Sequence, residues 1–152
     1  MGVEAHDIEP AAPSDYPIVQ AMLSDARLPV EDLGATAQVM FLIVRSNTQP
    51  VGAIGLERFG NAGLLRSLVV APQHRLRGLG RELVHALEQH ARASGITDLV
   101  LLTETAVTFF ARLGYSAISR DQAPPAVTRS AEFRTLCPAT AACMTKHLLP
   151  TL

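Results

Sequence analysis

Three arginines and two glycines gather in the stretch VVAPQHRLRGLGREL, residues 69–83. Glycine lets the backbone approach a ligand closely, and arginine supplies positive charge. A regular apolar spacing begins at Leu79, which indicates that a helix starts there. The first N–H groups of a helix lack partners within it and attract anions. The stretch therefore predicts a phosphate-binding turn, with a solvent-facing arginine loop as the plain alternative.

Two common phosphate-binding schemes do not fit this turn. A dinucleotide fingerprint requires G-x-G-x-x-G, but its third glycine would fall on Leu83. A P-loop requires Lys-Ser or Lys-Thr after its second glycine, and no such pair follows Gly78 or Gly80. The pattern that remains is R-x-x-G-x-G, which runs from Arg75 to Gly80 directly before the helix.

The elements that must position the turn follow from apolar spacing and turn residues. Ser14 is placed to cap a helix that begins at Asp15 and ends near Pro29. A second helix starts at Leu79 and is capped by Gly95. A third helix is expected over 104–114, and strands over 3–11, 38–47, 51–59, 64–70, 96–103, 115–119 and 141–149.

The connections between these elements predict how the strands pair. Short turns join 38–47, 51–59 and 64–70, so these strands form an antiparallel meander. The crossover through the helix at Leu79 makes strand 96–103 parallel to 64–70. In that helix the apolar stripe contains Leu83, Val84, Leu87 and Ala91, whereas Arg81, Glu82, Glu88 and Arg92 are expected to fall outside it.

The overall composition narrows the class of protein. A chain of 152 residues fits a single domain over 1–152. A formal net charge of -1 gives no basic field for nucleic acid or an anionic membrane, so neither is expected as a partner. The first ten residues lack the pattern of a signal peptide, and two cysteines are too few for a disulfide framework, so a cytoplasmic protein is expected. The five histidines show no ligand spacing, and no metal is expected.

Residues 64–83 resemble motif A of the GNAT N-acetyltransferases, and AVTFFARLGYSAI (106–118) resembles motif B of that family. The resemblance implies an α/β fold: a mixed, mostly antiparallel sheet of about seven strands, splayed between two parallel strands and flanked by about four helices. It implies acetyl-CoA as donor, with the pantetheine arm on Leu68, Val69 and Val70. The Leu68 N–H would polarise the acetyl carbonyl. The pyrophosphate would bind the backbone of Arg75, Leu76, Arg77, Gly78, Leu79 and Gly80.

The resemblance leaves the proton chemistry open. Family members often use a tyrosine as the acid that protonates the leaving thiolate, and the matching residue here is Phe110, beside the expected cofactor. Glu57 lies in a largely apolar strand and is the favoured base, with plain exposure on an alternating strand as its alternative. Glu104 is the second candidate base, although a helix cap would also explain it.

The C-terminal segment PPAVTRSAEFRTLCPATAACM, together with the two motifs, resembles the arsenic-resistance N-acetyltransferases. These are associated with acetylating the amino group of arsinothricin, an arsenic analogue of glutamate. Arg66 would bind a substrate carboxylate, with Arg129 or Arg134 as further partners for anions. The alternative is that Arg66 pairs with Glu57 across the GNAG turn. The implied substrate-binding residues are Glu57, Arg66, Ser67, Thr103, Glu104, Phe133 and Cys137.

Alternatives remain for the amine substrate and for the activity itself. The amine could instead be phosphinothricin or another small amine such as an antibiotic. The chain could also be a non-catalytic acetyl-CoA-binding sensor, since Phe110 lacks a hydroxyl group. Relatives are often dimers, and an exposed C-terminal strand edge could pair between subunits in a homodimer.

Overall fold

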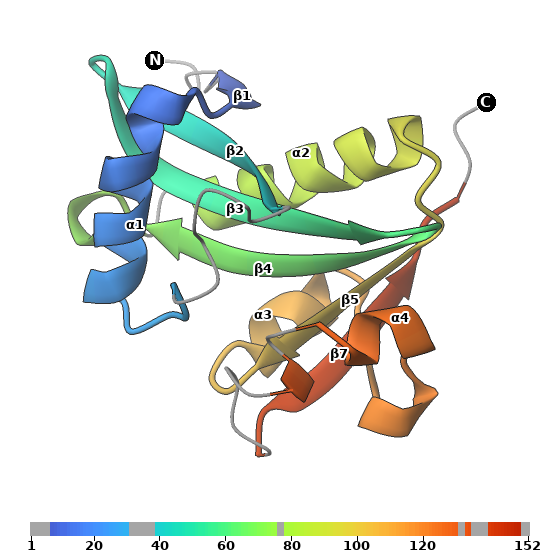
Figure 1. The fold of residues 1–152 in the computed structure, drawn as a ribbon. Helices are drawn as coiled ribbons and strands as arrows, with labels where there is room; N and C mark the ends of the chain where they lie inside the picture. The colour runs from blue at the N-terminus through green and yellow to red at the C-terminus, as the bar shows by residue number, and fades with distance from the viewer. Residues whose placement is uncertain (1–6, 31–38, 76–77, 131–132, 135–139, 150–152) are drawn as a thin grey trace.

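The computed structural model describes residues 7–30, 39–75, 78–130, 133–134 and 140–149, and every structural statement below concerns these residues. Seven strands form one sheet in the order β1-β2-β3-β4-β5-β7-β6 (Figure 1). The strands are β1 Ile8–Pro10, β2 Val39–Ser46, β3 Gln49–Phe59, β4 Ala62–Val70, β5 Asp98–Thr103, β6 Ser116–Ile118 and β7 Ala142–His147. The helices are α1 Tyr16–Asp25, α2 Leu79–Ala93, α3 Val107–Arg112 and α4 Pro125–Thr128.

The predicted meander of β2, β3 and β4 is confirmed. Both strand pairs are antiparallel, and the turns between them are short. Asn47 and Thr48 have φ of 50° and 74°, and Gly60 has φ of 67°. Positive φ at such turns matches the twist of the flanking strands, so these turns set the register of the meander.

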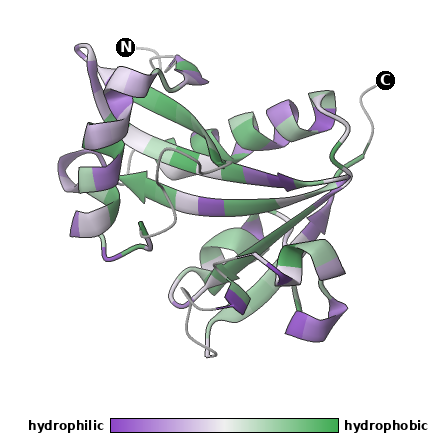
Figure 2. Cartoon of the chain, in the orientation of Figure 1, coloured by the Kyte–Doolittle hydropathy of each residue, from purple (hydrophilic) through white to green (hydrophobic). Residues whose placement is uncertain are grey.

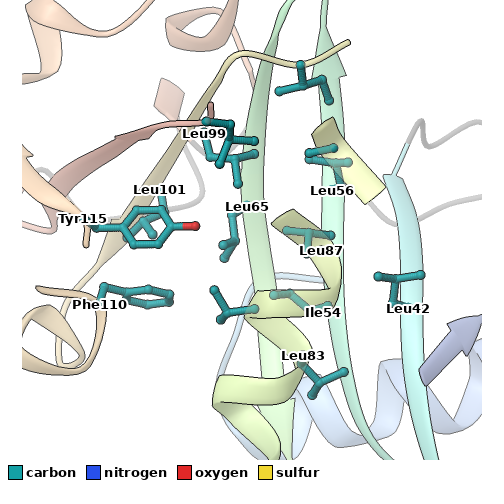
Figure 3. Close-up of a cluster of buried hydrophobic side chains, with 14 of the residues drawn as sticks. Leu42, Ile54, Leu56, Leu65, Leu83, Leu87, Leu99, Leu101, Phe110 and Tyr115 are labelled. Atoms are coloured by element: carbon teal, nitrogen blue, oxygen red, sulfur yellow. The ribbon is translucent and has the colours of Figure 1, made fainter. Parts of the chain in front are cut away.

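The helices cover the two faces of the sheet in pairs. The largest apolar cluster packs α2 and the Phe110 ring of α3 against one face (Figure 3). On the other face, α1 packs against β2 and β3, and Val127 of α4 packs against β4 and β5. Hydrophobic and hydrophilic residues alternate around the turns of α2 (Figure 2), as expected for a helix with one face on a sheet.

β4 and β5 are parallel but stay paired over only three residues. Ala62–Leu64 lies beside Asp98–Val100, and beyond Leu64 the two strands diverge (Figure 1). β7 pairs with β5 on its other side. The predicted α/β fold, with a mostly antiparallel sheet splayed between two parallel strands, is therefore confirmed.

Two local expectations on the N-terminal side and at the sheet edge are wrong. Ser14 lies inside a 3-10 turn, Pro13–Asp15, and makes no cap bond to α1; the carboxylate of Asp15 instead accepts the Ala12 N–H at 2.9 Å. The last strand, β7, is not an exposed edge, because β6 pairs with its middle residues. The edge strands of the sheet are β1 and β6.

The end of α2 follows the sequence closely. Gly95 has φ of 84° and follows the capping residue Ser94. The N–H of Gly95 bonds the carbonyl of Arg92, and the N–H of Ile96 bonds that of Ala91, both within 3.1 Å. This is a Schellman ending, in which glycine supplies the left-handed residue.

Candidate active site

The start of α2 is built as an open backbone turn. Gly78 is the residue before the helix; its φ of 77° is one that residues with a side chain rarely adopt. A side chain there would meet no heavy atom within 4 Å, so the surface beside Gly78 is open. None of the described side chains caps the helix start, so its first N–H groups are available to solvent or a ligand. Leu76 and Arg77, also predicted here, lie outside the described residues.

Two contacts attach this turn to the sheet and to α3. The Nε of Arg75 donates to the carbonyl oxygen of Val70 at 3.0 Å, which joins the turn to the end of β4. Phe109 of α3 lies against Gly80, since its ring would be 3.4 Å from a Cβ placed there. The turn is therefore bounded by β4 on one side and an aromatic ring on the other.

β4 carries a bulge just before it reaches the turn. Ala53 pairs with Val69 and Gly55 with Arg66, so two residues of β4, Ser67 and Leu68, stand opposite one residue of β3. Ser67 has φ of 59°, the irregular geometry of a bulge. Because β5 has already diverged, the described residues provide no strand partner for the outer edge of β4 from Leu65 to Val70. Sequence reasoning predicted the splay but not the bulge.

A charged pair lies on β3 and β4 next to the bulge. The side chain of Arg66 is fully buried, and its Nη1 is 3.4 Å from Oε1 of Glu57, whose side chain is 17% exposed. The Nε of Arg66 donates to Oγ of Ser67 at 3.1 Å. Glu57 pairs with Leu64 in the register, so Glu57 and Arg66 are diagonal neighbours across the strands. Three predicted substrate residues, Glu57, Arg66 and Ser67, are thus brought together.

This pair lies on the face of the sheet opposite to α2. Arg66 follows Leu64 by two residues on β4 and therefore shares its face. Leu64 packs with Val127 of α4, and Val69, beyond the bulge, packs with α1. The guanidinium is therefore buried between the parts of the sheet that α1 and α4 cover.

The C-terminal segment contributes to the same face. Phe133 is buried in the cluster that contains Leu64, and the guanidinium of Arg120 lies 5.9 Å above its ring. Arg120 also donates to the carbonyl oxygen of Ala141 at 3.3 Å. Arg129 and Arg134 are exposed. Sequence reasoning missed Arg120, because nothing in its neighbourhood distinguishes it from a surface arginine.

The remaining candidates have other surroundings. Oγ1 of Thr103 accepts the N–H of Ala106 at 3.0 Å just ahead of α3. Glu104, considered as a cap of this helix, is exposed and makes no cap bond to it. Cys137 lies outside the described residues. The other cysteine, Cys143, is buried, and burial raises the pKa of its thiol.

Phe110 is buried within a row of aromatic rings. Its centroid lies 5.0 Å from that of Phe109 and 5.5 Å from that of Tyr115, both edge to face. The hydroxyl of Tyr115 donates to Glu88, and burial, followed by the charge of Glu88, raises the pKa of this phenol well above its usual range. Tyr115 is therefore a poor substitute for the proton donor that Phe110 does not provide.

A cavity of about 590 Å³ opens along α2, lined by residues that include Arg81, His85, Glu88, Leu113 and Lys146. It shares no lining residue with the Glu57–Arg66 pair.

Among the described residues, no group of three possible metal ligands occurs. No described helix is long and apolar enough to cross a membrane.

The sheet splays between β4 and β5, and α2 begins beside this splay directly after Gly78. Such an arrangement can bind an extended ligand along the strand edge and an anionic group at the helix start. The sequence profile of the Acetyltransferase (GNAT) family matches residues 6–115. The chain belongs to this family.

Known relatives and solved structures agree with this assignment. An amino-acid acetyltransferase from Pseudomonas syringae pv. syringae is 38% identical over 65 residues, which are 43% of this chain and 15% of the relative. N-acetylglutamate synthase from Neisseria gonorrhoeae, complexed with coenzyme A and N-acetyl-glutamate, has a TM-score of 0.80 at 20% identity, over 96% of this chain and 36% of that one. Rv2747 from Mycobacterium tuberculosis, solved with CoA, has a TM-score of 0.79 at 23% identity, over 94% and 99% of the two chains. At these identities the structures show a shared fold, and the chain spans only a small part of the Pseudomonas relative.

Proposed function

We propose that the protein is an N-acetyltransferase that moves the acetyl group of acetyl-CoA to the amino group of a small acidic amino acid. The observation that carries the proposal is the outer edge of β4 beyond Leu64, for which the described residues provide no strand partner and which leads past the buried Arg66 toward the open glycine turn at Gly78. This edge would lie along the donor, with Arg66 at one end for the acceptor and the turn at the other for the diphosphate. Membership of the family supports the donor.

The donor would be held mainly by the backbone. N–H groups at Gly78, Leu79 and Gly80 would bind the diphosphate, because they combine unpaired donors with the positive end of α2. The pantetheine arm would replace β5 beside Leu68, Val69 and Val70. The bulge at Ser67 turns the backbone there, and the N–H of Leu68 would bind the acetyl oxygen as negative charge develops on it. The N. gonorrhoeae structure and the M. tuberculosis structure both contain coenzyme A, which supports coenzyme A as the ligand of this fold.

The chemistry is a direct attack on the thioester. The lone pair of the neutral amine forms the C–N bond, the C–S bond breaks, and its electron pair leaves with the thiolate. The proton lost by the amine would pass through water to Glu57, whose carboxylate pairs with Arg66. Since Phe110 has no hydroxyl, the thiolate would be protonated by water after it leaves.

The acceptor is proposed from the charge beside the reaction centre. A guanidinium carries five N–H donors and binds carboxylates in bidentate fashion. The substrate carboxylate would thus share Arg66 with Glu57. The activities that the Pseudomonas and Neisseria relatives are named for, acetylation of an amino acid and synthesis of N-acetylglutamate, support an amino-acid acceptor.

Arsinothricin is the particular acceptor proposed, on the resemblance of the C-terminal segment. It is an analogue of glutamate with a second acidic end. Arg120, which lies over Phe133 on the same face as Arg66, is better placed for that second anion than the exposed Arg129 and Arg134. Phosphinothricin has the same charges and is the matched alternative. The cytoplasmic location expected from the sequence and the homodimer expected from the resemblance both stay predictions.

The test is thiol release from acetyl-CoA with a panel of amines. We expect turnover with arsinothricin, phosphinothricin or glutamate, much less with glutamine, and none with an aminoglycoside. Glutamine is the matched control, because it removes one negative charge from glutamate at almost constant shape. Coenzyme A binding without thiol release for any amine would favour the sensor. Equal turnover with glutamate and glutamine would remove the requirement for a second anion.

A further inference from the structure

Glu88 of α2 is a buried carboxylate, contrary to the expectation that it lies outside the apolar stripe. Its side chain is 6% exposed, and its helix neighbours Val84 and Ala91 are buried in the main core. A buried carboxylate is strongly unfavourable unless it is paired and hydrogen-bonded. Its partners must therefore explain its position.

Three chain segments meet at this carboxylate. The hydroxyl of Tyr115 donates to Oε2 at 2.9 Å, and Nζ of Lys146 lies 3.1 and 3.0 Å from the two oxygens. The same Nζ donates to the carbonyl oxygen of Leu113 at 2.8 Å and lies over the Tyr115 ring. Glu88 thereby joins α2 to the corner between α3 and β6, and to β7.

The corner is shaped to admit the lysine. Gly114 has φ of 96°, and a side chain there would come within 3.3 Å of Cε of Lys146. Glycine at this position both permits the turn and leaves room for the lysine stem. The network therefore depends on the form of the corner as well as on the three polar side chains.

Aromatic contacts lead from the network to the glycine turn. The Tyr115 ring packs against Phe110 (Figure 3), and Phe110 packs against Phe109. Phe109 in turn lies against Gly80. A shift of the corner would therefore move the ring that bounds the start of α2.

We propose that Glu88, Tyr115 and Lys146 are positioning residues for the donor: they fix α3 against α2 and so hold Phe109 at the glycine turn where the diphosphate binds. The inference rests on the proposed donor site but is independent of the amine. None of the three side chains would touch the acetyl group. Their loss should thus weaken coenzyme A binding and raise the KM for acetyl-CoA, while kcat at saturation stays nearly unchanged.

Coenzyme A titrations by calorimetry test this directly. We expect Lys146→Met and Tyr115→Phe to raise the Kd for coenzyme A by about three- to thirtyfold, the usual range for residues that act through a packed network. Lys146→Arg keeps the charge and should recover most of the affinity. Tyr115→Phe removes a single oxygen atom, so it keeps the test meaningful if Lys146→Met does not fold.

Arg45→Met is the matched control. Arg45 of β2 bonds Asp15 and Glu9 near the β1 edge of the sheet, whereas α3 leads into β6 at the opposite edge, so loss of Arg45 should lower the melting temperature and leave the Kd for coenzyme A unchanged. If folded Tyr115→Phe and Lys146→Met also keep the wild-type Kd, the network is only structural and the inference is wrong. If the wild-type protein itself fails to bind coenzyme A, the proposed function fails as well.

Discussion

Glu88 and Arg66 are buried charged side chains on opposite faces of the sheet, and they are held in different ways. Glu88 lies between three segments, with partners at 2.9–3.1 Å that come from the α3–β6 corner and from β7. Arg66 faces Glu57 at 3.4 Å, and both belong to adjacent strands that are already joined by backbone hydrogen bonds.

From this difference we infer that Glu88 has a structural role, whereas Arg66 is suited to bind a ligand. The Glu88 network joins the helix α2 to the α3–β6 corner and to β7, with which a helix forms no strand pairing, so removal of the network should move α2 relative to them. The Arg66–Glu57 pair stands on rigid strands that do not need it for their pairing, and such positions hold functional groups accurately. We therefore expect the two networks to give opposite kinetic responses: donor affinity for the first, and chemistry and acceptor affinity for the second.

The largest effect is expected from Glu57→Gln, which tests whether the Arg66–Glu57 pair takes part in the chemistry. The amide keeps the shape but accepts a proton far less readily. If Glu57 is the base, kcat should fall by about 10²–10⁴-fold, with the Kd for coenzyme A unchanged. Steady-state kinetics with the best amine of the panel, and calorimetry with coenzyme A, measure both. Wild-type turnover in this variant would remove Glu57 as the base.

A smaller effect is expected from Arg66→Lys. Lysine keeps the positive charge but loses the bidentate geometry for a carboxylate. We expect the KM for the acidic amine to rise by about ten- to hundredfold, equivalent to about 1.4–2.8 kcal/mol, with little change in the KM for acetyl-CoA. If the KM for acetyl-CoA rises instead, Arg66 contributes to donor binding, which contradicts the assignment of Arg66 to the acceptor.

Two glycines provide a matched pair for the donor turn itself. Gly78 and Gly60 both have positive φ, and a Cβ at either would meet nothing within 4 Å. Alanine at each should lower the free energy of unfolding by a similar amount, about 1–2 kcal/mol for the left-handed backbone. Only Gly78→Ala should weaken coenzyme A binding. Equal coenzyme A affinities for the two variants would argue against a donor site at the start of α2.

The smallest effect concerns an ion pair that belongs to neither network. The Arg45 guanidinium, and then the Ala12 N–H, hold the pKa of Asp15 below its ordinary value. An acid with a lowered pKa in the folded state stabilises the fold above its unfolded pKa, about 3.9, and loses that contribution as the pH falls through the folded value. The stability difference between wild type and Asp15→Asn should therefore be constant from pH 7 to 5 and shrink below pH 4. Urea unfolding at several pH values measures it; a difference that stays constant down to pH 3 would contradict the linkage.

The sequence predicted the framework of the site well, for physical reasons. The spacing of leucines in α2, the glycine after it and the short turns of the meander are local signals, and the helix, its ending and the antiparallel strands all follow from them. The crossover rule likewise predicted that β4 and β5 are parallel. These features depend on residues close together in the chain.

The features that the sequence did not predict depend on distant partners. Ser67 adopts a left-handed φ with no glycine to indicate it, because the mismatch of β3 and β4 imposes the bulge. Glu88 was expected outside the apolar stripe of α2 but is buried. Its burial depends on Tyr115 and Lys146, which lie 27 and 58 residues away in the chain and are not visible in the local spacing. The short helix α4 begins at Pro125, a favourable first residue, but no helix was predicted there.

Amide hydrogen exchange with and without coenzyme A tests the central claim most directly, since the claim concerns backbone N–H groups. Binding should slow exchange among Leu68–Val70, on the outer edge of β4, and at Gly78–Gly80, at the start of α2. The strand residues Leu42–Val44, on the far side of β3, should be unaffected. Coenzyme A binding that protects neither β4 nor the start of α2 would contradict the proposed donor site.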